Sequence, residues 1–436
     1  MIFLLALVAF YVAWNLGAND VANSMGTSVG SKALTLQRAL LIAGILELAG
    51  AVLFGQNVAA TLATEIVNPA IFASEPLILL AGMTSVMIAC GLWMQVATYK
   101  GWPVSSSHAV VGALAGFSWS AKGVTAVDWS NIGIISLTWL ATPLISGAIA
   151  GCFYILIKHW ILNHPKPLQQ LNEWIPWLSS LLLSIFGAIV LPTFSPAIET
   201  RIKTYFGFHL PSHDIPLGIG ASAALCLSII NWRQLESKIQ STKHNPHNPA
   251  NTIHKTSKSP LTIVEQQLAG FQILSACFVA FAHGSNDVGN AVAPLAAIAY
   301  IHRTGSPPGI NFSIPLWILL LGGAGIVCGL AISGKKVITT VGEGIIPLQP
   351  SGGFCAELAC ATTVLFASRL GLPVSTSHAL VGGVVGIGIV QRWYNSSSSD
   401  IIRLPTVWGI FLAWLITVPL TAALGATIFT IARALL

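Results

Sequence analysis

Two short polar motifs each occur twice in the chain, and the first has the chemistry of a cation site. Residues 17–23 read GANDVAN and residues 284–290 read GSNDVGN. Carboxylate and amide oxygens are hard ligands that suit Na⁺ and similar cations. Glycine permits an unwound backbone with free carbonyls, and an Asp and an Asn three residues apart share one side of a helix. The predicted cation ligands are therefore Asp20, Asn23, Asp287 and Asn290. The alternative is a hydrogen-bond network that only joins helices.

The second motif has the chemistry of an anion site. Residues 101–109 read GWPVSSSHA and residues 371–379 read GLPVSTSHA. A proline followed by hydroxyl residues is typical of a helix start, where free backbone N–H groups and the helix dipole attract oxyanions. His108 and His378 are expected to pack in the hairpins, and plain N-capping of a buried helix is the alternative to anion binding. The predicted ligands of a tetrahedral oxyanion such as phosphate are Ser105, Ser106, Ser107, Ser375, Thr376 and Ser377, together with Asn19, Asp20, Asn286 and Asp287.

Two further acidic residues lie inside apolar stretches. Glu47 and Glu357 have no acidic counterpart in the other half of the chain. Each is predicted either to neutralise a coupling cation, as an additional Na⁺ ligand, or to bond a neighbouring helix. Gln95, Thr98 and Ser368 precede the second motif copies and are expected to line the same pocket.

The composition places these polar groups in a membrane. Apolar residues make up 54% of the chain and charged residues only 8%, whereas soluble domains carry about 25% charged residues. The net charge of +6 is dispersed, which favours basic loops at a membrane surface over nucleic-acid binding. The seven cysteines form no CxxC pair, so we expect buried packing residues and no cofactor, with a sodium ion serving only as the coupling ion.

The pattern of apolar stretches predicts an all-α polytopic membrane protein with about ten to twelve membrane segments. Stretches 103–119 and 373–391 are interrupted by Gly, Pro and Ser, so they are expected to form re-entrant helical hairpins facing protein or a water-filled cavity. Full spans need ~20 residues each. They are predicted at 1–27, 37–58, 77–99, 130–158, 177–193, 214–232, 266–302, 315–334, 354–370 and 405–434.

Basic residues predict how the two halves are oriented. The polar segment 233–265 is the most basic loop, which indicates the cytoplasmic side. The turn with Lys32 and Arg38 is then inside, and the turn at 56–76, which has no Lys or Arg, is outside. The halves are therefore predicted to run in opposite directions, an inverted-topology repeat with its site at the interface. The expected units are a first repeat at 1–160, connecting membrane helices at 161–232, a cytoplasmic linker at 233–265 and a second repeat at 266–436.

Both duplicated motifs together resemble the inorganic phosphate transporter (PiT) family. The resemblance rests on GANDVANS and GSNDVGNA, on PVSSSHA and PVSTSHA, and on the basic loop between the halves. It implies symport of inorganic phosphate driven by Na⁺ or H⁺, alternating access, a homodimer, and a place in the plasma or inner membrane. The run GANDVANSMGTSVGSKALT resembles the Na⁺-coupled branch of the family.

Three readings of function remain open at the level of sequence. The favoured one is a sodium-coupled phosphate symporter, and the second is a proton-coupled phosphate symporter or a sulfate permease of the same fold. The third is an intramembrane enzyme or an anion channel. An enzyme needs a nucleophile beside a base, which the Ser-Ser-Ser-His string offers. Duplication of that string in both halves favours a site that opens to both sides, and thus a transporter that is not an enzyme.

Overall fold

The computed structural model of the protein describes residues 2–193, 199–201, 203–204, 214–243, 259–309, 312–394 and 401–435. The regular secondary structure of the described residues is helical apart from one β-bridge, between Val67 and Val127. Its main helices are α1 (Ile2–Gly30), α2 (Leu36–Phe54), α3 (Gln56–Thr64), α4 (Pro76–Lys100), α5 (Ser106–Lys122), α6 (Trp129–Ile157), α7 (Pro167–Val190), α9 (Asp214–Lys243), α10 (Pro260–Thr304), α11 (Leu316–Ser333), α12 (Lys335–Gly344), α13 (Pro350–Arg369), α14 (Thr376–Tyr394) and α15 (Leu404–Ala434).

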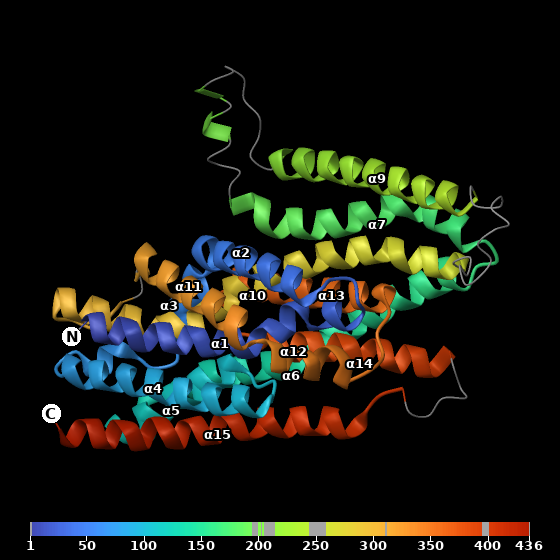
Figure 1. The fold of residues 1–436 in the computed structure, drawn as a ribbon. Coiled ribbons are helices and arrows are strands. Elements are labelled where there is room, and N and C mark those ends of the chain that lie inside the picture. The colour runs from blue at the N-terminus through green and yellow to red at the C-terminus, as the bar shows by residue number, and fades with distance from the viewer. Residues whose placement is uncertain are drawn as a thin grey trace.

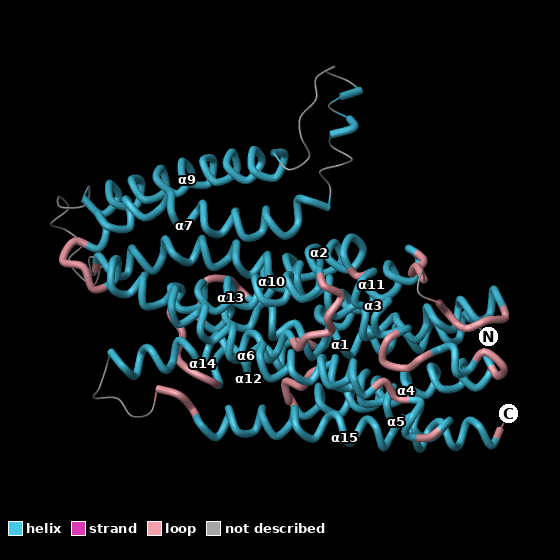
Figure 2. Tube along the Cα trace, turned by 180° about the vertical axis from the view of Figure 1, so that it is seen from behind, coloured by secondary structure: helices cyan, strands magenta, loops and turns pink. Residues whose placement is uncertain are grey.

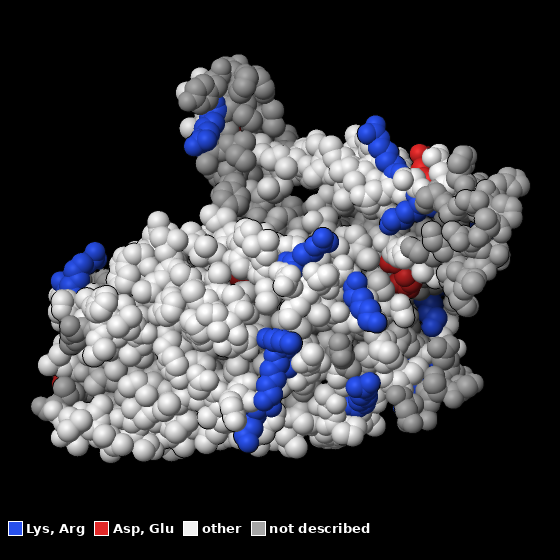
Figure 3. Space-filling model, viewed as in Figure 1, with Lys and Arg blue, Asp and Glu red and all other residues white. Residues whose placement is uncertain are grey.

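The helices form a bundle suited to a bilayer, which confirms the predicted all-α polytopic fold. Ten of the described helices are long and apolar enough to cross a membrane. The pair α7 and α9 lies along one edge of the bundle, and α15 lies beside α5 at the opposite edge (Figures 1 and 2). Figure 3 shows a broad left-hand face that is almost free of charged residues, whereas Lys and Arg gather in the right half of the view.

The two motif-bearing helices occupy the centre of the bundle. The 29 residues of α1 and the 45 residues of α10 run in opposite directions through it (Figure 1). Both helices continue without a break through their motif, so the predicted unwinding at the glycines is wrong. A Cβ atom on Gly17 would overlap the carbonyl of Ile326, and one on Gly284 would overlap the carbonyl of Glu47. These glycines are needed because neighbouring backbones touch there.

Two helical hairpins carry the second motif. In the first hairpin, α4 and α5 are joined at Gly101, and in the second, α13 and α14 are joined at Gly371. Both glycines adopt left-handed backbone angles, with φ of 72° and 71°, as helix C-termini often require. Each hairpin thus consists of two long arms. The stretches 103–119 and 373–391 supply only the second arm of each hairpin, because α4 and α13 form the first arms.

Several boundaries also differ from those predicted. Helix α9 continues to Lys243 and helix α10 begins at Pro260, so the segment expected as a linker at 233–265 is helical at both ends. Positions 244–258 lie outside the described residues. The expected span 37–58 divides at Gly55 into α2 and α3. The helix α12 was missed, since its buried residues Val337, Ile338 and Val341 form too short an apolar run. All seven cysteines are free thiols, and Cys152 and Cys226 are exposed, contrary to the expected burial.

Candidate functional site

The first asparagine of each NDV motif forms hydrogen bonds with the tip of one hairpin. Asn19 donates from Nδ2 to the carbonyl of Trp102 at 2.9 Å, and its Oδ1 accepts from the backbone N–H of Val104 at 3.2 Å. It also donates to Thr98 Oγ1 at 3.3 Å. Asn286 makes the matching contacts in the second half, to Leu372 O at 3.2 Å and Ser368 Oγ at 2.9 Å. Thr98 and Ser368 therefore lie at the site, as expected. Both amides face protein here, and their contact with phosphate stays a prediction.

The second asparagine of each motif reaches across to the hairpin of the opposite half. Asn23 donates to Thr376 Oγ1 at 3.2 Å and to Asp20 Oδ1 at 3.1 Å. Asn290 donates to the hydroxyls of Ser106 and Ser107 at 3.1 and 3.2 Å. These crossed contacts bring both copies of both motifs into one place, which the duplicated sequence predicted.

The hairpin tips form a cluster of donors without a basic side chain. Ser105 and Ser375 cap α5 and α14 by accepting from the backbone N–H groups of His108 and His378, at 3.3 and 3.2 Å. Ser107 Oγ donates to Val374 O at 2.9 Å, which joins the two tips directly. Among the described residues, no Lys or Arg is buried. An anion held between these helix starts would therefore rely on hydroxyls, N–H groups and helix dipoles.

A buried cluster of acidic groups adjoins the hairpin tips. One ligand atom each from Asp20, His283 and Asp287 lies within 4.8 Å of the others. Thr376 donates to Asp287 Oδ2 at 2.9 Å, whereas Asp20 Oδ2 is buried without a hydrogen-bond partner. Paired carboxylates in a low dielectric repel each other strongly. The arrangement can therefore bind a cation or a proton.

His283 connects this cluster to Glu47. Its Nδ1 atom lies 3.2 Å from Glu47 Oε2, and its Nε2 atom lies 2.9 Å from Asp287 Oδ2. Ser24 donates to the other oxygen of Glu47 at 2.9 Å. A neutral imidazole has only one N–H group, so contact with both carboxylates requires a second proton on the histidine or on one acid. Sequence reasoning missed His283, because Leu16 occupies the corresponding place in the first copy.

Glu357 forms a separate polar centre. Its carboxylate accepts from the hydroxyls of Thr27, Ser28 and Ser275 at 2.6, 2.7 and 2.8 Å, and from Gln272 Nε2 at 3.2 Å. These donors come from α1 and α10, so Glu357 of α13 joins three helices at a fully buried point. The structure thus shows the helix-joining role that the sequence left open, and the same oxygen-rich shell also suits Na⁺.

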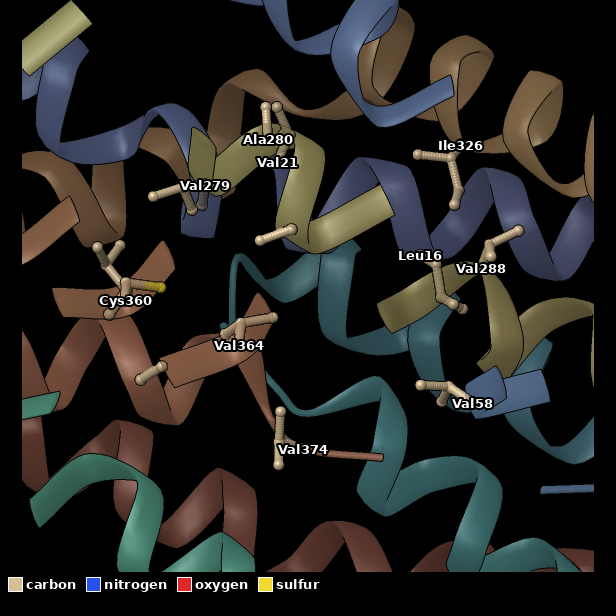
Figure 4. Packing of buried hydrophobic residues seen from close by; sticks show 14 of the residues in the cluster. Leu16, Val21, Val58, Val279, Ala280, Val288, Ile326, Cys360, Val364 and Val374 are labelled. Carbon is tan, nitrogen blue, oxygen red and sulfur yellow. The ribbon is translucent and has the colours of Figure 1, made fainter. Parts of the chain in front are cut away.

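Apolar side chains pack in the interior of the bundle, on the same helices that carry both polar centres. Figure 4 shows buried side chains of α1, α10, α11 and α13 packed together, among which Leu16, Val288, Ile326 and Val364 are all at most 1% exposed. Val374 brings the tip of the second hairpin into the same packing. Water is thereby kept from the carboxylates, and electrostatic interactions inside the site are strong.

Two tryptophans outside the hairpins, on α6 and α15, pack against the hairpin histidines and donate hydrogen bonds to the hairpin tips. His108 stacks on Trp139 of α6 with ring centroids 3.9 Å apart, and its Nδ1 lies 3.3 Å from the carbonyl of Trp414 on α15. His378 stacks on Trp414 at 3.8 Å and lies 3.0 Å from the carbonyl of Trp139. The expectation that the histidines pack in the hairpins agrees with these contacts. The two indoles, which sequence reasoning missed, donate to opposite hairpins, Trp139 to Pro373 O at 3.1 Å and Trp414 to Pro103 O at 3.2 Å.

Comparison with known proteins decides the family. The sequence profile of the phosphate transporter family matches residues 16–425, which include all four motif copies. The chain belongs to the phosphate transporter family. The resemblance seen in the motifs is thereby confirmed, and the family is one of transporters, in agreement with the prediction that the protein is not an enzyme.

Relatives within the phosphate transporter family match over nearly the whole chain. The inorganic phosphate transporter 2-1, chloroplastic, of Arabidopsis thaliana is 39% identical over 97% of this chain and 70% of its own length. A protein of Chlamydia trachomatis is 37% identical over 98% of this chain and 97% of its own. A solved structure titled the sodium-dependent phosphate transporter is 33% identical, with a TM-score of 0.81 and coverage of 100% and 99% of the two chains.

Proposed function

We propose that this protein is a secondary transporter that carries inorganic phosphate together with Na⁺ by alternating access. The observation that carries the proposal is the crossed contact between the halves, in which Asn23 reaches Thr376 and Asn290 reaches Ser106 and Ser107. Each half supplies one acidic motif and one hairpin to a single buried site. Membership of the phosphate transporter family supports phosphate as the substrate.

Phosphate would lie between the starts of α5 and α14. The hydroxyls and first-turn N–H groups of Ser105–Ser107 and Ser375–Ser377 would donate to its oxygens. Asp20 Oδ2 is a buried acceptor without a partner, and a protonated phosphate can donate to it. Sulfate is fully ionised near neutral pH and has no such proton. This acceptor therefore supports phosphate over sulfate.

Sodium would neutralise the acidic cluster. Asp20, Asn23, Asp287 and Asn290 are the proposed ligands nearest to phosphate, with Glu47 acting through His283 and Glu357 forming a second site. A dianion and two carboxylates repel strongly in a low-dielectric pocket, so they can share it only if cations lie between them or if a phosphate proton is donated to a carboxylate. The similarity to a solved structure named as a sodium-dependent phosphate transporter supports this choice of ion.

One observation favours a proton as the coupling ion. The continuous contact from Glu47 through His283 to Asp287 has the form of a proton-sharing chain. In that alternative, an acid in the cluster carries the proton and no metal is bound. Phosphate binding would then follow pH and ignore Na⁺.

The transport cycle would exploit the duplication of the chain. The opposite directions of α1 and α10 support inverted repeats, and such repeats give equivalent openings to the two sides. The proposed phosphate and Na⁺ ligands are at most 5% exposed, so phosphate can leave only after the hairpins or their neighbours move. We also propose a homodimer in the plasma or inner membrane, with the 233–265 segment on the cytoplasmic side, on the basis of the family resemblance and of the basic residues.

Binding measurements at fixed pH test the coupling. Phosphate should be titrated calorimetrically into purified protein at several Na⁺ concentrations, with choline replacing Na⁺ to keep ionic strength constant. Phosphate affinity should rise with Na⁺, and Na⁺ affinity should rise with phosphate by the same factor, because linkage is reciprocal. Affinity that changes with pH but not with Na⁺ would favour the proton alternative.

A further inference from the structure

An apolar groove of about 530 Å³ opens between α6, α14 and α15, away from the ion and phosphate site. Its lining is almost wholly apolar and includes Pro143 and Ile155 of α6, Val390 of α14, and Val407 and Phe411 of α15. Two of its three helices, α6 and α15, are long and apolar enough to cross a membrane, where the groove would be filled by something equally apolar. Polar ligands and water are therefore poor occupants for it.

Glycines create this groove. A Cβ atom on Gly386 would overlap the carbonyl of Gly147, and one on Gly382 would overlap the carbonyl of Pro143. The backbones of α6 and α14 thus touch, with no side chains to fill the space above their contact. The other wall is formed by α15, whose Phe411 is 45% exposed. The space left above this contact is lined by apolar side chains.

Three cations lie at one end of the groove. Lys158, Arg392 and Arg403 are each within about one helical turn of a lining residue, namely Ile155, Val390 and Val407. Lys158 Nζ lies 4.8 Å from the ring centre of Tyr394, so the ends of α6 and α14 are adjacent. A Cβ atom on Gly388 would lie 2.8 Å from Ile402 Cγ1, which places the start of α15 at the same end.

We expect this end of the groove to lie at the level of the lipid headgroups. Trp160, Trp393 and Trp408 each lie within five residues of one of these cations in the sequence. They are 48%, 75% and 61% exposed, as expected for a tryptophan belt at a membrane surface. Within the described part of the chain, none of the three cations forms an ion pair with an acidic residue. Their charge is therefore available to an anion at the membrane surface.

We propose that the groove is a binding site for an anionic phospholipid, with its headgroup phosphate at Lys158, Arg392 and Arg403 and one acyl chain along the groove. A second copy of the chain is a poorer occupant, because a two-fold contact centred here would bring two sets of cations together. The groove ends at Trp414, which stacks on His378 of the second hairpin. A bound acyl chain would thus contact both α14, which is one arm of the second hairpin, and Trp414.

Two native cysteines allow a direct test on the full-length protein in detergent. Cys152 lines the groove, and Cys226, which is also exposed, lies on α9 at the other edge of the bundle. Dioleoyl-phosphatidylglycerol is titrated in, and maleimide modification of each cysteine is followed by peptide mass spectrometry. We expect the anionic lipid to slow the modification of Cys152 and leave that of Cys226 unchanged. Dioleoyl-phosphatidylcholine should protect Cys152 much less.

Variants separate the headgroup from the groove. K158Q/R392Q/R403Q should weaken protection by the anionic lipid by about fivefold per cation removed, whereas Arg433→Gln, at the far end of α15, should not. The proposal would be overturned if both lipids protected Cys152 equally, or if the triple variant kept the protection by the anionic lipid. It would also be overturned if protection of Cys152 depended on protein concentration in the absence of lipid, which would indicate a second copy of the chain in the groove.

Discussion

Asn23 and Thr376 lie in opposite halves of the chain, and the Nδ2 atom of Asn23 donates to the hydroxyl of Thr376 at 3.2 Å. Thr376 in turn donates to Asp287 at 2.9 Å. The hydroxyl at the start of α14 is therefore shared between the acidic motifs of both halves. Displacement of the second hairpin must change the surroundings of Asp287 directly and those of Asp20 through Asn23, which gives a physical route for coupling an anion to a cation.

The motif aspartates should be required for coupling. Asp20→Asn and Asp287→Asn each remove a charge that offsets the cation while keeping the shape of the side chain, so Na⁺-driven phosphate uptake should fall sharply in both. Uptake is measured in proteoliposomes at matched protein content. Asp128→Asn, in the N-cap of α6 outside the site, is the control. Normal Na⁺-driven uptake by both motif variants would refute the assignment.

The hairpin hydroxyls should bind phosphate. Thr376→Ala should weaken phosphate binding by roughly ten- to a hundredfold, because a hydrogen bond to a charged group contributes roughly 1.5–3 kcal/mol. Ser118→Ala is the matched control, since Ser118 is buried in α5 and its hydroxyl has no hydrogen-bond partner. The affinities are compared by calorimetry. Equal affinity in the Thr376 and Ser118 variants would place phosphate elsewhere.

The motif glycines should be needed for helix packing. Gly17→Ala and Gly284→Ala would press a methyl group onto a neighbouring carbonyl, and such overpacking costs roughly 1–3 kcal/mol. Gly133→Ala, on α6, meets nothing within 4 Å and should be neutral or stabilising, because Ala favours helix by about 1 kcal/mol. Thermal unfolding of the purified variants measures the difference. Equal melting temperatures for Gly17→Ala and Gly133→Ala would contradict the packing account.

The two tryptophans should position the hairpins. Trp139→Phe and Trp414→Phe keep a ring against the histidine but remove the hydrogen bond to the opposite hairpin, which contributes about 0.5–1.5 kcal/mol. We expect the KM for phosphate to rise severalfold and to a similar extent in both, because their contacts match. Trp119→Phe changes an exposed ring, 57% exposed, and serves as the control. A rise in one variant only would show that the two hairpins are held unequally.

The sequence predicted the parts of the site that are duplicated. The proline and hydroxyl runs place the starts of α5 and α14 correctly, because capping is a local property of a few residues. The glycines in the NDV motifs were misread as unwinding signals. Whether a glycine frees the backbone or admits a neighbouring helix depends on residues such as Ile326, which are distant in the chain.

Residues outside the two polar motifs were harder to find. His283 has Leu16 in its place in the first copy, and Trp139 and Trp414 stand in the matching but apolar runs WLAT and WLIT. Their roles arise only when α6, α10 and α15 pack against the hairpins. Glu47 was noticed as a buried acid, but its link to Asp287 passes through His283, and no local pattern indicates that link. Long-range packing thus determines which residues contact the proposed ligands and the hairpins from neighbouring helices.

Uptake of radiolabelled phosphate into proteoliposomes tests the central claim most directly. Purified protein is reconstituted, and uptake is measured with an inward Na⁺ gradient, with choline in place of Na⁺, and with excess sulfate as competitor. The account predicts concentrative phosphate uptake that requires the Na⁺ gradient, resists sulfate and disappears in the Asp287→Asn variant. Phosphate uptake that proceeds equally with choline, or that sulfate suppresses as strongly as unlabelled phosphate does, would contradict it.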